Sequence, residues 1–213
     1  MTYRALSIIS ENKKTRSKYI DLGKTGLTEI PKELFSFYWL EVLVLSNVWE
    51  EYNIQDKRWE TKYSQNVGLD NNIEIIDKEI IRLKNLKKLV LSGSFNNKWK
   101  LSDLKNLASL PNLQLLFFDN TGVSSLEPLS EISSLVQIYF DFTIVSDLTP
   151  IENLNNLKVV SCQHTPVQSL LPIINLSAIE ILYVRNTKIN DISSVRKLIH
   201  LREIYLSNTS FIL

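Results

Sequence analysis

Residues 135–154 read LVQIYFDFTIVSDLTPIENL, and this stretch decides the fold because its pattern returns every 22 residues. Threonine occupies one place in five successive units: Thr121, Thr143, Thr165, Thr187 and Thr209. Proline occupies another place in three of them: Pro128, Pro150 and Pro172. Other columns in the same register are apolar, such as Leu116, Ile138, Val160, Leu182 and Ile204. A fixed period of this kind predicts a solenoid, in which stacked units bury one continuous core.

The unit beginning at Leu135 has the form L-x-x-I-x-F-x-x-T-x-V-x-x-L-x-x-I-x-x-L, which is the spacing of a leucine-rich repeat. The chain therefore resembles the leucine-rich-repeat superfamily. Residues 145–151 and 189–195 are similar to the 22-residue coil of the internalin class, and residues 26–34 to the 23-residue coil of intracellular leucine-rich-repeat proteins. The fold expected is an α/β solenoid, a horseshoe with about eight parallel strands on its concave face. Short irregular, 3-10 or helical segments are expected on the convex side.

Each position of the unit has a physical reason for its residue type. Counting Leu135 as the first position, positions 3 to 5 should form a short strand. Side chains at positions 4 and 6 then point into the core, and those at 3, 5 and 7 point to the concave face. The threonine hydroxyl at position 9 can bond to backbone groups that the turn leaves unpaired. The proline column suits a 3-10 connection because proline fixes φ and has no N–H.

We expect one domain over residues 1–213, with four parts. Residues 1–16 should form an amphipathic capping helix, 17–47 the first coils, 48–71 an insertion, and 72–213 the remaining coils, the last of them incomplete. The apolar run 211–213 leaves three readings of the C-terminal edge open. It folds over the open end, it pairs with another chain, or the natural protein is longer.

The insertion is rich in aromatic residues. Trp49, Tyr52, Trp59 and Tyr63 have a spacing close to one face of a helix, although a hairpin is equally open. These aromatic side chains either pin the insertion onto the solenoid or form a protruding arm, which would be a second contact surface.

Composition excludes several classes of function. The chain has 24 basic and 23 acidic residues, a net charge of +1, so it lacks the cationic field that draws proteins to nucleic acid or acidic lipid. No apolar run approaches the roughly 18 residues of a membrane helix, and the N-terminus does not resemble a secretory signal. Cys162 is the only cysteine. We therefore expect a cytoplasmic protein that binds neither nucleic acid nor membrane, and the resemblance to internalin-type repeats implies that it is bacterial.

The sequence also argues against an enzyme. Cys162 falls at an inward position and His164 at a strand exit, so a nucleophile–base pair is not expected. No zinc-binding spacing and no glycine-rich phosphate loop occur, so we expect neither metal nor cofactor. Asp119 and Asp141 do occupy position 7 of neighbouring strands. They are either solvated or able to accept a partner's lysine or arginine, or a weakly held cation.

Function is expected on the outward positions, which carry many aromatic residues. The candidate partner-binding residues on the concave face and its rim are Leu115, Phe117, Asp119, Tyr139, Asp141, Phe142, Tyr183, Arg185 and Tyr205. The leading hypothesis is a non-catalytic scaffold that binds a protein partner on this face, which is also what the resemblance implies. The alternative is a recognition or regulatory segment of a larger multidomain enzyme or receptor. Self-association through the C-terminal edge is a further possibility.

Overall fold

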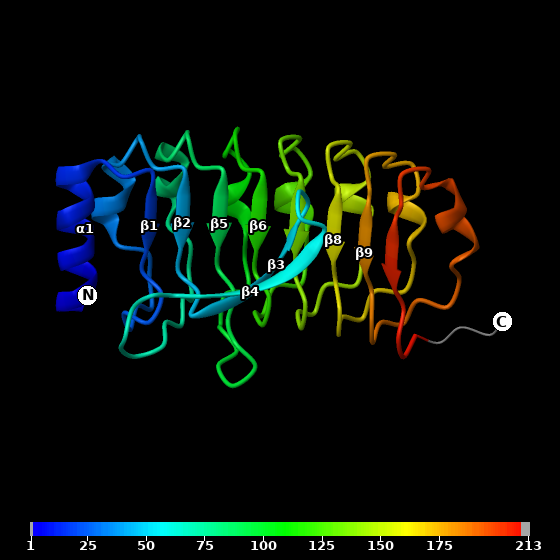
Figure 1. The fold of residues 1–213 in the computed structure, drawn as a ribbon, viewed down its shortest axis with the longest axis horizontal. Coiled ribbons are helices and arrows are strands. Elements are labelled where there is room, and N and C mark those ends of the chain that lie inside the picture. The colour runs from blue at the N-terminus through cyan, green and yellow to red at the C-terminus, as the bar shows by residue number, and fades with distance from the viewer. Residues whose placement is uncertain (1, 210–213) are drawn as a thin grey trace.

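The fold is a solenoid built on one parallel sheet. The computed structural model describes residues 2–209, the side chain of Ser194 excepted. Eight strands lie side by side in chain order (Figure 1). They are β1 (Tyr19–Asp21), β2 (Val42–Val44), β5 (Lys88–Val90), β6 (Leu115–Phe117), β7 (Gln137–Tyr139), β8 (Val159–Ser161), β9 (Ile181–Tyr183) and β10 (Glu203–Tyr205). The predicted sheet of eight parallel strands is confirmed.

Short 3-10 segments lie on the other side of the coils, as the proline column indicates. They are η1 (Lys32–Ser36), η2 (Lys78–Arg82), η3 (Lys105–Leu107), η4 (Glu127–Leu129), η5 (Thr149–Ile151), η6 (Leu171–Ile173) and η7 (Ser193–Lys197). Pro128, Pro150 and Pro172 each stand in the first positions of such a segment, where the missing N–H costs nothing. We call the sheet surface turned away from these segments the concave face.

The core between sheet and 3-10 segments follows the repeat. Side chains at position 4, within the strand, and at position 6, just after it, are fully buried in the coils of β6, β7 and β8, for example Leu116 and Phe118. The threonine at position 9 forms a hydrogen bond within the turn that follows the strand. Thr121 Oγ1 donates to the carbonyl of Phe118 at 2.7 Å, and Thr143 Oγ1 donates to the carbonyl of Phe140 at 2.8 Å. The predicted role of the threonine hydroxyl is therefore confirmed. We call this repeated interior the first core.

The N-terminal end of the first core is covered by a helix, α1 (Tyr3–Thr15). Thr2 caps it, since its Oγ1 accepts from the backbone N–H of Ala5 at 3.3 Å. Ala5 and Ile9 are buried against the first coil. Asn12 Nδ2 donates to the carbonyls of Ser17 and Tyr19 at 3.1 and 3.0 Å, which fixes the helix to β1. The helix expected at the N-terminus is present.

The insertion is an antiparallel hairpin rather than a helix. Its strands are β3 (Val48–Asn53) and β4 (Arg58–Tyr63), and Tyr52 lies directly opposite Trp59. The helix-like spacing of the aromatic residues is thus a coincidence of two strands joined by a short turn. Figure 1 shows the hairpin crossing in front of the sheet from beside β2 toward β8. The regular interior resumes at Asn71, which is fully buried and donates to the carbonyls of Leu22 and Leu45.

At the C-terminal end, the run 211–213, on which the three readings of the edge depend, lies outside the described residues. Among residues 2–209, none of the helices has the length and apolar character needed to cross a bilayer.

Candidate functional site

The hairpin fills the middle of the concave face. Trp49 and Tyr52 are 6% and 4% exposed and pack on outward-facing side chains of the central strands. We call this second apolar cluster the second core; its buried members are Val44, Trp49, Tyr52, Val90, Phe117, Tyr139, Val159 and Ile181. Trp59 reaches furthest along the sheet, with its ring centre 6.0 Å from that of Tyr139 and 4.2 Å from that of Tyr183. For Trp49, Tyr52 and Trp59 the structure shows the reading in which they pin the insertion onto the solenoid, whereas Tyr63 does not join this cluster.

Polar contacts fix the hairpin at its middle. The backbone N–H of Tyr52 donates to Tyr139 Oη at 3.0 Å, and Tyr52 Oη donates to the carboxylate of Glu203 at 3.1 Å. Glu51 forms ion pairs with Lys88 on β5 and, at 3.2 Å, with Lys62 on β4. These contacts hold the hairpin to β5, β7 and β10, strands far apart in the sheet.

The base of the hairpin is tied to the first coil. Ser64 Oγ donates to the carboxylate of Asp21 at 2.9 Å, and the backbone N–H of Ser64 donates to the carbonyl of Asn47 at 2.9 Å. Gly23 lies against this junction, where an added Cβ would come within 2.2 Å of the Ser46 carbonyl oxygen. Between the base and the tip, β3 and β4 pair with each other and with no strand of the parallel sheet in the described residues.

This arrangement separates the predicted contact residues into covered and accessible ones. Phe117 and Tyr139 face outward as predicted, but they are 0% and 1% exposed because the hairpin lies on them. They are therefore not accessible to a partner in this conformation. In the hairpin, Trp49 and Tyr52 point inward, whereas Tyr63 is 62% exposed.

The remaining predicted aromatic residues form a strip beside the hairpin. Tyr183 and Tyr205 lie on the neighbouring strands β9 and β10, with ring centres 4.0 Å apart, and both are partly buried. The Arg185 guanidinium lies 5.3 Å from the Tyr183 ring centre and 5.0 Å from that of Tyr205. We call Tyr183, Arg185 and Tyr205 the C-terminal strip. It keeps the mixture of large rings and a cation that is typical of binding hot spots.

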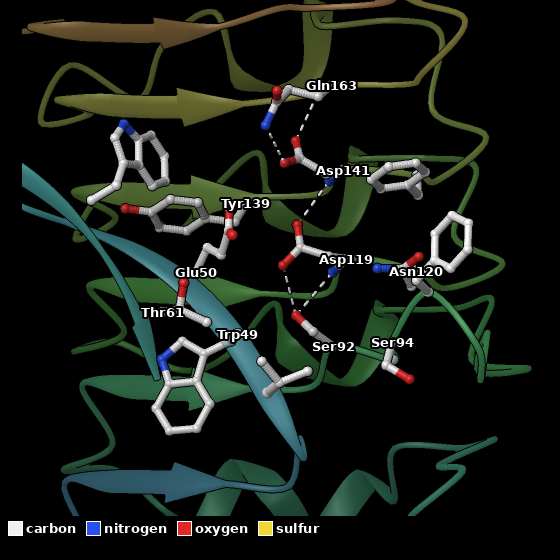
Figure 2. Close-up of a pocket in the computed structure, with 15 residues that line it drawn as sticks. Trp49, Glu50, Thr61, Ser92, Ser94, Asp119, Asn120, Tyr139, Asp141 and Gln163 are labelled. Atoms are coloured by element: carbon white, nitrogen blue, oxygen red, sulfur yellow. Dashed lines mark hydrogen bonds between the residues drawn. The ribbon is translucent and has the colours of Figure 1, made fainter. Parts of the chain in front are cut away.

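A pocket of about 240 Å³ opens between the hairpin and the carboxyl ends of the central strands. Figure 2 shows Asp119 and Asp141 at its floor, with Trp49 and Glu50 on the hairpin side. Aromatic rings line it from both sides: Trp49 and Trp59 from the hairpin, Tyr139 from the sheet, and Phe95 and Phe142 from the loops after the strands. The pocket thus combines apolar walls with carboxylates.

Both aspartates accept hydrogen bonds from a serine hydroxyl and from the backbone N–H of the position-7 residue in the next coil. Asp119 accepts from the backbone N–H of Asp141 at 2.8 Å and from Ser92 Oγ at 2.8 Å. Asp141 accepts from Ser161 Oγ, from the backbone N–H of Gln163 and from Gln163 Nε2, all within 2.8 Å. Each carboxylate therefore ties the end of its own strand to the next coil. Both side chains are partly buried between the hairpin and the loops and line the pocket.

Burial makes these carboxyls weak acids. It raises the pKa of Asp119 to about 6, with its hydrogen bonds opposing the effect. It raises the pKa of Asp141 to about 8, and repulsion from Asp119 adds to the rise. The main cause is desolvation, because removing a charged carboxylate from water is costly, and within residues 2–209 neither aspartate forms an ion pair that would offset it.

Sequence reasoning did not single out several residues that line this pocket, among them Glu50, Ser92, Phe95 and Gln163. Ser92 and Gln163 belong to the same position-7 column as the aspartates, so the column itself was the available signal. The position of Glu50 could not be predicted from the sequence, because it depends on how the hairpin packs on the sheet.

Nothing resembling a catalytic constellation appears in the described part of the chain. The Cys162 thiol is buried in the first core, which raises its pKa, while His164 is exposed and stacks on Phe142 at 4.1 Å between ring centres. In residues 2–209, no three histidine, cysteine or acidic side chains converge as metal ligands would.

Comparison with known proteins identifies the fold. No protein-family model matches the sequence, and no curated protein matches it. Among solved structures, a leucine-rich-repeat protein of Leptospira interrogans matches with a TM-score of 0.72 and 22% identity over 89% of this chain and 43% of its own. Internalin C2 of Listeria monocytogenes matches with a TM-score of 0.64 and 21% identity, over 88% of this chain and 80% of its own.

A plant peptide hormone receptor, solved in complex with RGF2, matches with a TM-score of 0.65 and 21% identity over 89% of this chain and 28% of its own. This chain therefore spans less than half of the Leptospira protein and of the plant receptor. The neighbours are leucine-rich-repeat proteins, and the predicted leucine-rich-repeat solenoid is confirmed.

Proposed function

We propose that this leucine-rich-repeat solenoid is a non-catalytic module that recognises a protein partner through the concave face. The contact surface is the C-terminal strip together with the mouth of the pocket. The observation that carries the proposal is the division of the concave face: the chain covers Phe117 and Tyr139 with its own hairpin, yet leaves the C-terminal strip partly exposed. The buried aromatic residues then position the hairpin, and the accessible ones meet the partner.

The chemistry of the strip supports protein recognition. Tyrosine and arginine offer large contact area with hydrogen-bonding ends at modest entropic cost. The plant receptor was solved in complex with RGF2, so one neighbour of this fold is known with a bound partner. The near-zero net charge supports the expectation that nucleic acid and membrane surfaces are not the partner. A cytoplasmic, bacterial setting remains part of the proposal.

A second candidate is a recognition or regulatory segment of a larger enzyme or receptor. The partial coverage of the Leptospira protein and of the plant receptor favours it, since such solenoids occur within longer chains. Self-association through the edge of β10, which pairs with β9 alone in the described residues, is a related possibility.

Affinity capture from the lysate of the source organism, read by mass spectrometry, tests the proposal. Wild type is compared with the double variant Arg185→Ala/Tyr205→Ala, which keeps Tyr139 and Tyr52. Because Tyr205 also donates to Glu203, the carboxylate that Tyr52 contacts, near-ultraviolet circular dichroism must show that the hairpin is still packed. Tyr38→Ala is the matched control, since Tyr38 is 60% exposed and lies far from the concave face on the turn after η1. We expect a partner that wild type and Tyr38→Ala retain and that the double variant loses. Equal retention by all three would refute the C-terminal strip as the contact surface.

A further inference from the structure

The concave face already holds two cations of the chain beside aromatic rings. The Lys88 ammonium is ion-paired with Glu51 and lies 5.1 Å from the ring centre of Phe117 and 5.6 Å from that of Trp49. The Arg185 guanidinium lies over the two tyrosine rings of the C-terminal strip. A cation beside aromatic faces is attracted by their quadrupoles, more strongly where water is excluded. The concave face therefore already places positively charged side chains beside aromatic rings at two positions.

The pocket contains the same ingredients without a cation. Its lining offers the faces or edges of aromatic rings from both sides and the carboxylates of Asp119, Asp141 and Glu50. In the part of the chain that the structure describes, no lysine, arginine or histidine lines it. Among the residue pairs of residues 2–209, none of these three carboxylates forms an ion pair, whereas Glu51 nearby has two.

The carboxylates have capacity left for a ligand. An ionised carboxylate offers about four acceptor positions. Asp119 uses two of them and Asp141 three, on donors of the neighbouring coils. Glu50 is exposed on the hairpin at the mouth of the pocket. The remaining positions suit a donor that brings several N–H groups and positive charge at once.

We propose that this pocket binds an arginine side chain of the partner, with its guanidinium between the aromatic rings and its N–H groups on Asp119, Asp141 and Glu50. A guanidinium fits better than an ammonium because it is planar, stacks on rings and donates to more than one carboxylate. The raised pKa values of Asp119 and Asp141 are compatible with this assignment, since a guanidinium bound beside these carboxyls would favour their ionised form and lower both values. The proposal rests on the proposed function, whose partner supplies the arginine.

The test uses the full chain and three small probes: Nα-acetyl-arginine amide, Nα-acetyl-lysine amide and Nα-acetyl-citrulline amide. Citrulline has the shape of arginine without the charge. Binding is followed by NMR of the indole N–H signals, because Trp49 and Trp59 line the pocket while Trp39 and Trp99 lie elsewhere. Ionic strength is held constant with sodium chloride. We expect a saturable shift of the two pocket signals with the arginine probe, and binding at least about tenfold weaker with citrulline.

Two variants assign the shift to the pocket. Glu50→Lys places an ammonium at the mouth without disturbing the fold, since Glu50 is exposed, and should abolish binding of the arginine probe. Glu152→Lys makes the same charge change on an exposed residue after η5 and should bind like wild type. Asp141→Asn should weaken binding about tenfold. Circular dichroism and the indole spectrum of each variant show whether it is folded.

Three results would overturn the proposal: no saturable shift with the arginine probe, equal binding of arginine and citrulline, or equal loss in Glu152→Lys and Glu50→Lys. These outcomes are distinguishable from failure of the proposed function. If the arginine probe fails but Arg185→Ala/Tyr205→Ala still loses the captured partner, recognition stands and the pocket does not. If the probe binds in the pocket but no partner depends on the C-terminal strip, the pocket stands as an arginine site and the recognition surface is wrong.

Discussion

The first core and the second core are both built from buried apolar side chains, but the sequence specifies them in different ways. In the first core every coil repeats the same inward positions, so each side chain packs against its counterpart in the next coil, as Phe118 does on Phe140 at 5.7 Å between ring centres. In the second core the sheet side repeats, through columns such as Phe117 and Tyr139, but the hairpin side does not. It brings Trp49 and Tyr52 from one insertion onto strands much later in the chain, as the bond between Tyr52 and Tyr139 across 87 residues shows. The repeat therefore forms the concave face, and the hairpin, which is not part of the repeat, determines which side chains of that face stay exposed.

Removing a buried aromatic ring from each core should destabilise the molecule in two different ways. Phe140→Ala removes a fully buried ring from the first core and should lower the free energy of unfolding by about 4 kcal/mol. Because neighbouring coils share this core, the loss should appear in global unfolding. Urea denaturation followed by far-ultraviolet circular dichroism measures it. A change below about 1 kcal/mol would contradict a tightly packed first core.

The matching change in the second core is Trp49→Ala, with an expected cost of about 3 kcal/mol at the hairpin. The parallel sheet does not share backbone hydrogen bonds with β3 and β4, so the hairpin should detach while the solenoid stays folded. Limited proteolysis should then cut the exposed turn 54–57 much faster than in wild type, with the circular dichroism spectrum nearly unchanged. Global unfolding of this variant would show that the two cores are one cooperative unit.

Stability should also depend on pH through Asp119 and Asp141, the two carboxyl groups at the floor of the pocket. These carboxyls have raised pKa values, so between their ordinary value near 4 and about 8 the folded chain binds more protons than the unfolded one. Their contribution to stability is thus present at low pH and is lost as the pH rises. Asp141→Asn should be more stable than wild type at pH 9, on the order of 2 kcal/mol, and the difference should shrink toward pH 5.

The control for this pH dependence is Asp147→Asn. The exposed Asp147 accepts from the backbone N–H of Thr149 at 2.8 Å, which lowers its pKa. Its contribution to stability is therefore present at neutral pH and is lost as the pH falls, the opposite trend to that of Asp141. Thermal denaturation of both variants between pH 4 and 9 compares them. Parallel trends would contradict the burial of the Asp141 carboxylate.

The smallest expected effect concerns the turns of the first core. Thr143→Val keeps the shape of the side chain but removes the hydroxyl that donates to the Phe140 carbonyl, and should cost about 1 kcal/mol. Thr28→Val, at an exposed threonine, should leave stability nearly unchanged. The measurement is the urea midpoint of unfolding of each variant. Equal midpoints would show that the hydrogen bond of the threonine hydroxyl does not contribute to stability.

Sequence reasoning predicted the repeated part of the molecule well. The strand positions, the inward columns around Leu116 and Phe118, the threonine bonds and the 3-10 segments at the prolines all follow from one 22-residue unit. Each of these features is local to a coil or repeats between adjacent coils, so the period reveals it. The predicted contact residues were placed on the correct face for the same reason.

The insertion could not be predicted in the same way, because it occurs once and has no register to compare. Nothing in the sequence distinguishes Trp49 from Trp59. In the structure Trp49 is buried, whereas Trp59 packs against Tyr183. Likewise, Tyr139 and Tyr205 hold the same position of the repeat, and the hairpin covers one and leaves the other partly exposed.

By itself, the sequence determined a leucine-rich-repeat solenoid and the side chains that line its concave face, since a fixed period allows stacking in one register. Only the tertiary structure decided that the chain occupies the middle of that face itself, and that Glu50 meets Asp119 and Asp141 across a pocket. The physical reason is that these contacts join segments with no sequence relation to one another. They exist because burying the aromatic side chains of the hairpin favours one placement of it on the sheet.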